Sequence, residues 1–235
     1  MKYDFRLFRI KTGLVFIVLF FSFRALAQNV PDITSSITEG KVVYQLDFLD
    51  TVFNKNPIKE SLYPKEIISL FKEQKFRLEI QSESTNSSIY GDFTSRSTDN
   101  FLEVMHRKYH IKFNLDTLHL DAFQRNPFTV ISTKETKTIL GFLCQKLIIH
   151  YKNPYMKDAE IYLTKSLKNI PIPIAYAFSD LPGMILEATL EYQGILVHIT
   201  AKQVQRTQIS ASYFDLPTSP TLITVDEFIH KVIKQ

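Results

Sequence analysis

The sequence has 235 residues, of which 45% are hydrophobic, 22% charged and 13% aromatic. These proportions are typical of a globular protein and exclude a disordered, collagen-like or coiled-coil chain. The only cysteine is Cys144, so no disulfide can form within the chain. Its apolar neighbours Phe142 and Leu143 predict a buried, unreactive thiol.

The N-terminus has the pattern of a secretory signal peptide. Basic residues precede an apolar run of 10 residues from Leu14 to Phe23, and Ala25-Leu26-Ala27 follows. Because about 20 residues are needed to cross a bilayer, we predict cleavage after Ala27 rather than a membrane anchor. The predicted organisation is a signal peptide at 1–27, a flexible segment at 28–39 and a single β-rich domain at 40–235.

The net positive charge of the chain comes from the predicted signal peptide. Residues 1–27 hold five basic residues and one acidic residue, and their removal leaves 23 of each and no net charge. A neutral chain lacks the positive surface that attracts nucleic acids or anionic membranes. We therefore expect a periplasmic or secreted protein with no nucleic-acid partner and no membrane span after cleavage.

Alternating apolar residues predict strands that bury one face. The alternation occurs at Val42–Phe48, Phe76–Ile80 and Ile111–Leu115, whereas Ile139–Tyr151 is apolar on both faces and predicts a central or covered strand. Repeated strands with one wet face favour an antiparallel meander over βαβ units.

Two helices are expected to frame these strands. Pro64–Gln74 is predicted as a helix, because Pro64 suits a first helical turn and Ile67, Leu70 and Phe71 would share a face.

A hairpin and the second helix follow towards the C-terminus. Met184–Tyr192 and Ile195–Val204 form the predicted hairpin, joined at Gln193-Gly194. Thr224 and Glu227 have the spacing of a capping box, which predicts a helix starting after Thr224. The apolar face with which this helix would pack on the domain consists of Phe228, Ile229 and Val232. The predicted fold class is mainly β with a few helices (α+β), built on a large curved antiparallel sheet.

Motifs of catalysis and metal binding are missing from the sequence. No two of its six glycines lie within ten residues of one another, which excludes the dinucleotide fingerprint, the P-loop and the nucleophile elbow. His106 and His110 fall in predicted strands, where four residues span roughly 13 Å, and are interpreted as surface histidines. Glu187 and Glu191 share a strand face without a catalytic implication. We predict no enzyme activity, no cofactor and no metal, and assign no ligand-binding residue.

The segment Leu181-Pro182-Gly183-Met184-Ile185 resembles the signature of the GLPGLI proteins, which are exported proteins of Bacteroidetes. Leu181, Pro182, Gly183 and Ile185 match the signature, and Asp180 and Met184 depart from it. Similar features of that group lie at Gly40–Tyr44, Ile139–Cys144, Ile161–Thr164 and Phe214–Pro217, so the resemblance spans roughly 40–217.

The resemblance implies a fold like that of the LolA/LolB carriers, an open half-barrel of antiparallel strands with helices on its concave face, and it supplies no catalytic residues. Read by itself, the Pro182-Gly183 pair predicts a structural turn.

Two functions are compatible with these sequence features. The first is a non-enzymatic binding or carrier module for an apolar ligand such as a lipid, which the aromatic-rich sheet favours. The alternative is an envelope scaffold or protein-interaction module whose core is filled by its own side chains. An unrecognised hydrolase has no nucleophile or metal motif in its favour.

Overall fold

The computed structural model describes residues 37–49, 63–83, 85–104, 106–192, 194–218 and 222–228. The predicted signal peptide and residues 28–36 of the predicted flexible segment lie outside this part of the chain. Ser36–Gln235 form one compact unit, to which the following description applies. None of its described helices is long and apolar enough to cross a membrane.

The described residues of the unit form one 12-stranded sheet, in the order β12-β6-β5-β4-β3-β2-β1-β11-β10-β9-β8-β7. The strands are β1 (Glu39–Phe48), β2 (Glu66–Lys72), β3 (Lys75–Gln81), β4 (Thr85–Asp92), β5 (Ser97–Val104), β6 (Arg107–Asn114), β7 (Phe128–Ile139), β8 (Phe142–Tyr151), β9 (Ala159–Thr164), β10 (Met184–Tyr192), β11 (Ile195–Gln205) and β12 (Leu222–Ile223). The helical elements among the described residues are α3 (Leu115–Arg125), the 3₁₀ segments η2 (Pro173–Phe178) and η3 (Ala211–Phe214), and α4 (Val225–Phe228).

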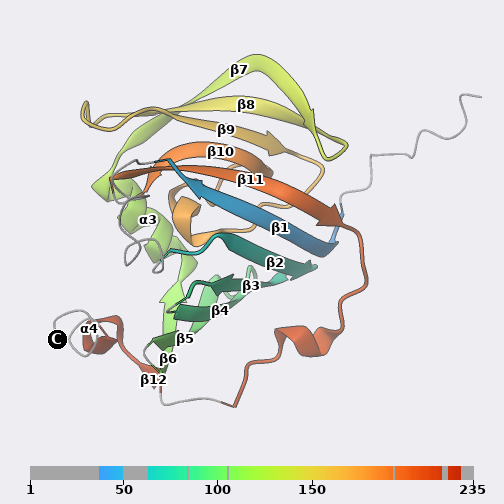
Figure 1. Cartoon of the computed structure of the whole chain (residues 1–235), viewed down its shortest axis with the longest axis vertical. Coiled ribbons are helices and arrows are strands. Elements are labelled where there is room, and N and C mark those ends of the chain that lie inside the picture. The colour runs from blue at the N-terminus through green and yellow to red at the C-terminus, as the bar shows by residue number, and fades with distance from the viewer. Residues whose placement is uncertain are drawn as a thin grey trace, which may run out of the picture. The chain divides into compact units, whose positions relative to one another are not determined.

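The sheet is curved and open, as Figure 1 shows. Neighbouring strands run antiparallel, except that β12 runs parallel to β6. The outermost strands β7 and β12 do not pair with each other in the described part of the chain. The predicted fold class, a large antiparallel sheet with few helices, is therefore confirmed.

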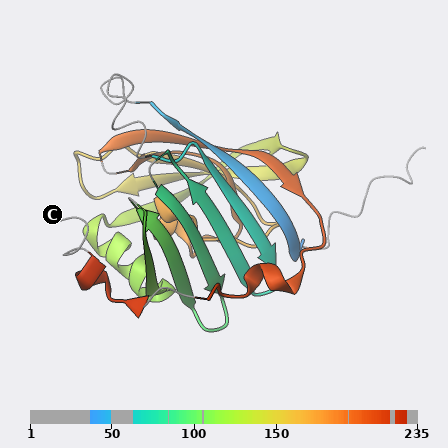
Figure 2. The ribbon, with the colours of Figure 1, turned by 60° about the horizontal axis from the view of Figure 1, so that its bottom comes forward.

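The core fills the concave side of the sheet. Along β1 the side chains of Val42, Tyr44 and Leu46 are buried and alternate with partly exposed ones, as the sequence predicts. The 3₁₀ segment η2 lies on the same side, where Ala175 and Phe178 join the apolar cluster. Figure 2 shows η2 between the two halves of the curved sheet.

The connection from β11 to β12 crosses the outer side of the sheet. Residues 206–218 form this strap, and its side chains Ile209 and Phe214 bury Leu70 of β2 in a second, small apolar cluster. The backbone N–H of Ile209 donates to the Glu39 carboxylate, and Lys72 Nζ donates to the Ile209 carbonyl at 2.9 Å. The strap thus covers an apolar stripe that would otherwise face solvent.

The strap explains why the predicted helix at Pro64–Gln74 is wrong. Most of that segment, Glu66–Lys72, is β2, which pairs with β1 and β3 on its two sides. Ile67 and Phe71 face the concave core, whereas Leu70 faces the opposite side and is buried there by the strap. Burial on both faces gives this strand the apolar spacing of a helix.

Two more predictions need correction. Ile139–Tyr151 is not one central strand, because Leu140 and Gly141 form a positive-φ turn between β7 and β8. The resulting strand β8 is second from the sheet edge. The alternation that predicts Leu115 in a strand ends at Asn114, and the helix α3 begins at Leu115.

Other predictions are confirmed. The hairpin is formed by β10 and β11. Cys144 is buried, and burial raises the pKa of its thiol to about 11. The helix after Thr224 begins with the predicted capping box, in which Glu227 N–H donates to Thr224 Oγ1 at 3.1 Å and Thr224 N–H donates to Glu227 Oε2 at 2.8 Å. Phe228 packs edge-on against Tyr109, with ring centroids 5.3 Å apart, and Ile229 and Val232 lie outside the described residues.

Candidate ligand-binding site

A pocket with an apolar floor opens at one end of the sheet, where the β2–β3 turn, the β4–β5 turn and the segment after β9 meet. It has a volume of about 260 Å³. We call it the end pocket. It is lined by the apolar side chains Ile37, Phe71, Phe93 and Ile170 and, at its rim, by Thr38, Glu73, Gln74 and Lys168.

The backbone holds the elements of the end pocket together. Ile37 forms a parallel bridge with Leu167, which ties the start of β1 to the segment after β9. Glu73 N–H donates to the Thr38 carbonyl at 2.7 Å, and Phe93 N–H donates to the Gln74 carbonyl at 2.8 Å. The pocket walls are therefore fixed by main-chain bonds, which favours a pre-formed site.

A close approach to Gly91 sets the aromatic wall. A Cβ atom at Gly91 would lie 2.0 Å from the ring of Phe76, so only glycine leaves room for that ring. The Phe76 ring in turn packs against Phe93, with centroids 5.1 Å apart. Gly91 thereby supports one wall of the end pocket.

The ammonium of Lys168 lies at the rim of the pocket between two neutral groups. Its Nζ donates to Gln74 Oε1 at 2.6 Å and lies 3.9 Å from the centroid of the Phe93 ring. The pKa of Lys168 is lowered because partial burial strips water from the ammonium, and attraction to Asp92 only partly offsets this. The end pocket thus combines an apolar floor with a cation that a ligand can approach.

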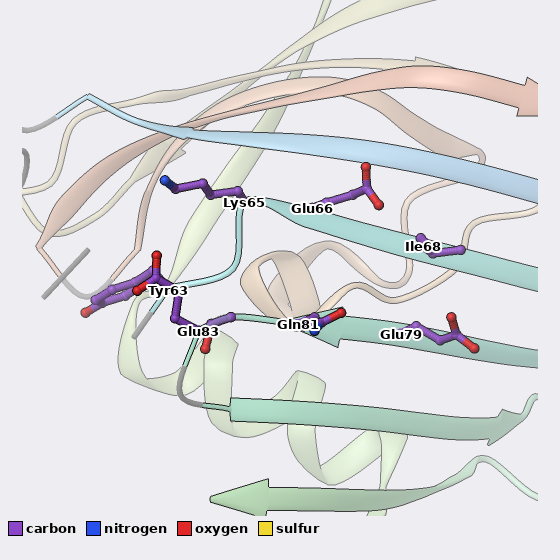
Figure 3. Close-up of a pocket in the computed structure, with 8 residues that line it drawn as sticks. Tyr63, Lys65, Glu66, Ile68, Glu79, Gln81 and Glu83 are labelled. Atoms are coloured by element: carbon purple, nitrogen blue, oxygen red, sulfur yellow. The ribbon is translucent and has the colours of Figure 1, made fainter. Parts of the chain in front are cut away.

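A second pocket, of about 390 Å³, lies beside β2 and β3 and is shown in Figure 3. Its lining includes three carboxylates, Glu66, Glu79 and Glu83, and only two large apolar or aromatic side chains, Tyr63 and Ile68. This composition disfavours an apolar ligand. The described residues contain no cluster of three His, Cys, Asp or Glu side chains that could hold a metal ion.

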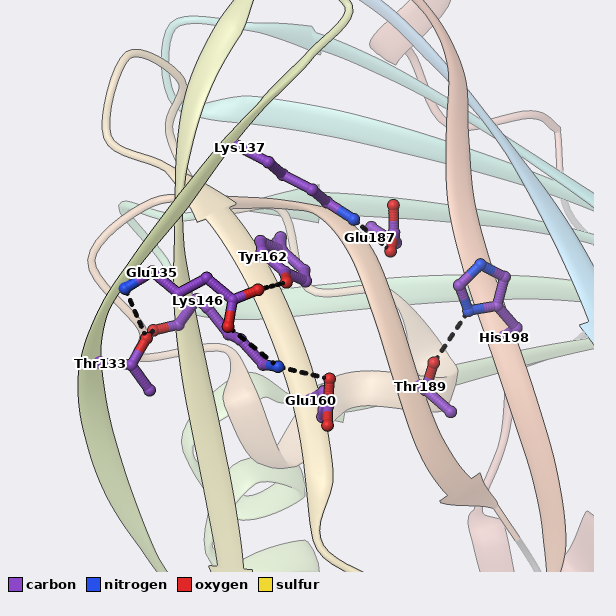
Figure 4. A network of polar contacts seen from close by, with 9 residues as sticks. All are labelled: Thr133, Glu135, Lys137, Lys146, Glu160, Tyr162, Glu187, Thr189 and His198. Carbon is purple, nitrogen blue, oxygen red and sulfur yellow. Dashed lines mark hydrogen bonds and ion pairs between the residues drawn. The ribbon is translucent and has the colours of Figure 1, made fainter.

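The outer face of β7–β11 carries a balanced polar network (Figure 4). Lys146 Nζ pairs with Glu160 at 2.9 Å and Glu135 at 3.4 Å, and the Tyr162 hydroxyl donates to Glu135. That hydrogen bond and Lys146 lower the pKa of the Glu135 carboxyl. Because each lysine here meets a carboxylate on another strand, the network joins strands of the sheet.

Glu187, which the sequence places on a strand face with Glu191, belongs to the same surface. Its carboxylate pairs with Lys137 Nζ at 2.5 Å, and that ammonium lies 3.8 Å from the centroid of the Tyr162 ring.

Of the predicted motif residues, Leu181, Pro182 and Gly183 lie between η2 and β10, and Ile185 lies in β10. Gly183 has a φ of +152°, and a Cβ atom there would lie 2.3 Å from the Thr164 carbonyl oxygen. Its N–H donates to the Leu181 carbonyl at 2.9 Å. Ile185 is buried in the core. These residues are part of the sheet framework and do not line the end pocket.

The two predicted surface histidines differ in their surroundings. His106 is exposed in the turn before β6. His110 is not a surface residue, because its side chain is only 12% exposed, bonds Asp99 Oδ1 at 2.8 Å and stacks on Phe101. Leu222 of β12 pairs with His110 at the edge of the sheet, a long-range contact that sequence spacing does not reveal.

The residues of the end pocket cannot be found from the sequence. Ile37, Phe71, Phe93 and Ile170 are distant along the chain and meet only through the sheet topology. Lys168 follows a strand in a segment with no motif, so no local signal distinguishes it from other surface lysines.

No family model matches the chain and no curated protein matches it, so membership of the GLPGLI family remains a prediction. Among solved structures, PNGF-II is similar with a TM-score of 0.54 and 15% identity over 84% of this chain, but the chain covers only 34% of PNGF-II. This likeness shows a shared fold.

More distant likenesses are found to two further structures. The Mycobacterium tuberculosis lipoprotein LppX has a TM-score of 0.36 and 8% identity, and the match covers 76% of this chain and 92% of that chain. The Pseudomonas aeruginosa MucA/MucB complex has a TM-score of 0.42 and 7% identity, and the match covers 80% of this chain and 58% of that chain. The open antiparallel sheet itself, and not these two likenesses, establishes the fold class.

Proposed function

We propose that this chain is a non-enzymatic, exported binding module that holds a small apolar group, such as the end of a lipid acyl chain, in the end pocket. The supporting observation is the lining, in which the side chains of Ile37, Phe71, Phe93 and Ile170 gather in one recess. At about 260 Å³ the pocket lies just below the roughly 300–1,000 Å³ usual for small-molecule sites. It therefore suits one end of a chain rather than a whole lipid.

The test uses 1-octanol as a neutral apolar probe. Residues 28–235 are prepared with ¹³C-labelled isoleucine methyl groups and titrated while their NMR spectra are recorded. Octanol in the end pocket shifts the methyl signals of Ile37 and Ile170, while Ile68 in the acidic pocket stays unchanged. Absence of any shift at Ile37 and Ile170 at the solubility limit of octanol would overturn the proposal.

Two variants locate the binding. Thr38 is exposed at the rim, so Thr38→Trp places a ring over the opening and is expected to abolish the shifts without disturbing the core. Glu79→Gln, in the acidic pocket, is the matched control and is expected to leave octanol binding unchanged.

A second candidate function is an envelope protein-interaction module. It is supported by the edge strand β7, which pairs only with β8 among described strands and exposes 44% of Val130 and 51% of Ile131. Edge strands with exposed apolar residues can pair with a strand of another protein. The test is chemical cross-linking of the protein to its envelope partner. Ile131→Lys should abolish the cross-link, whereas the control Thr138→Lys, on the same strand, should retain it. Equal cross-linking of both variants would reject this candidate.

A further inference from the structure

We propose that the end pocket selects amphiphiles with a carboxylate head, which binds the ammonium of Lys168 while the alkyl chain enters the recess. This inference rests on the proposed function, because it names the ligand class of the same pocket. Its basis is the position of Lys168, the chemistry of its partners and the other charges at the rim.

The position of Lys168 is suited to a ligand that is apolar at one end. Its Nζ lies over the face of Phe93, whose ring lines the apolar recess. A carboxylate bound to Nζ would therefore sit at the boundary between the recess and solvent. An alkyl chain extending from it would meet Phe93 first and then Ile37 and Ile170.

The present partners of Lys168 do not neutralise it. Gln74 offers an amide oxygen and Phe93 offers a ring face, and neither carries a charge. This contrasts with Lys146 and Lys137 on the outer face, which contact carboxylates at 2.9 Å and 2.5 Å. Charge-assisted hydrogen bonds are stronger than neutral ones, so a carboxylate ligand would replace a neutral partner by a better one.

Two acidic residues near the pocket would repel a carboxylate ligand and so oppose the proposed preference for it. Glu73 lines the rim, and Asp92 attracts Lys168 from the end of β4. If these carboxylates governed recognition, the pocket would prefer a cationic amphiphile. The experiment therefore includes a cationic probe of the same chain length.

The experiment compares octanoate, 1-octanol and octylammonium at pH 7, using the methyl shifts of Ile37 and Ile170 to measure each Kd. Octanoate and octanol differ in how strongly water solvates them, so their affinities for one protein cannot be compared directly. We therefore compare the ratio of octanoate affinity to octanol affinity between the wild type and each variant. Lys168→Met should lower this ratio about tenfold, as expected for losing one charged hydrogen bond. Lys168→Arg should retain it, and added salt should reduce it in the wild type.

The matched control is Lys65→Met, which removes a lysine of the acidic pocket and should leave the ratio unchanged. Glu73→Gln, which removes a rim carboxylate that opposes an anionic ligand, should raise the ratio. Since Lys168 is exposed, its variants should fold, and Lys168→Gln provides a second neutral replacement.

The outcomes separate the two proposals. If octanol binds in the end pocket but the ratio is the same in wild type and Lys168→Met, or if octylammonium binds more tightly than octanoate, the carboxylate preference is overturned and the binding function stands. If no probe shifts Ile37 or Ile170, both the binding function and the carboxylate preference are overturned.

Discussion

At the scale of single residues, Gly183 shows how one position fixes the entry to a central strand. Its φ of +152° is a conformation that residues with a side chain rarely adopt, and its Cα faces the Thr164 carbonyl on β9. Both features prevent a larger residue from being accommodated without moving one strand relative to another. Pro182 before it is exposed and fixes only its own backbone.

We predict that Gly183→Ala lowers the free energy of unfolding by more than about 2 kcal/mol, because backbone strain adds to the clash with Thr164. Gly141→Ala is the matched control. Its φ of +84° is also positive, but a Cβ atom there meets nothing within 4 Å, so strain alone should cost about 1 kcal/mol. Urea unfolding of both variants provides the measurement, and equal losses would contradict the role assigned to close packing at Gly183.

At the scale of elements, the strap is attached to the sheet through Glu39. The Glu39 carboxylate accepts the backbone N–H of Ile209 and pairs with Lys72 at 2.9 Å. The Ile209 N–H, followed by Lys72, holds the pKa of Glu39 below its ordinary value of 4.5. A carboxyl group with a lowered pKa in the folded state stabilises that state when ionised.

This contribution gives a pH-dependent prediction. The stability difference between wild type and Glu39→Gln should be fully present above pH 4.5 and should shrink as the pH falls through the lowered pKa of the folded state. The measurement is a series of urea midpoints between pH 7 and pH 3. A difference that stays constant over this range would show that the charge of Glu39 does not stabilise the strap.

The apolar side of the strap gives a separate prediction. Phe214 is 7% exposed and packs in the cluster with Leu70, whereas the neighbouring Tyr213 is 51% exposed. Phe214→Ala should lower the free energy of unfolding by about 3 kcal/mol, and Tyr213→Ala by less than about 0.5 kcal/mol. The comparison uses thermal or urea unfolding. Similar small losses for both variants would mean that the strap is not part of the cooperative fold.

The strap also marks the limit of what local patterns predict. The alternation at Phe76, Leu78 and Ile80 predicts β3 correctly, because that strand has one wet face. The neighbouring β2 has the pattern of a helix, because its outer residue Leu70 is buried by Ile209, a residue far away in the sequence. Local patterns reveal strands with one exposed face but not strands covered by a distant segment.

At the scale of the whole molecule, the same reasoning applies to the candidate site. The open sheet and its few helices follow from repeated alternation, which is a local signal. The end pocket depends on which turns the topology brings to one end, and Lys168 lies 94 positions from the Gln74 side chain that it contacts. No spacing rule connects such residues, so the fold class is predictable from the sequence and the site is not.

The position of β11 leads to a prediction for the whole chain. This strand pairs with β1 on one side and β10 on the other, so it joins the two halves of the sheet. A chain ending at Gly194 should therefore show no cooperative unfolding transition. A chain ending at Thr218 loses β12, which pairs with β6 through only two residues, and should still unfold cooperatively. Circular dichroism during urea titration distinguishes the two, and a cooperative transition in the shorter chain would contradict the central role of β11.

The pairing of β1 with β11 also sets the order of events during synthesis. Lys41 is paired with Gln205, 164 positions later, so the ribosome makes most of the chain before β1 can acquire its second neighbour. Contacts of such separation form slowly, since the intervening chain must first be ordered. A nascent chain of this design cannot complete its core until β11 emerges, so the last native contacts of β1 become available only after the ribosome has added Gln205.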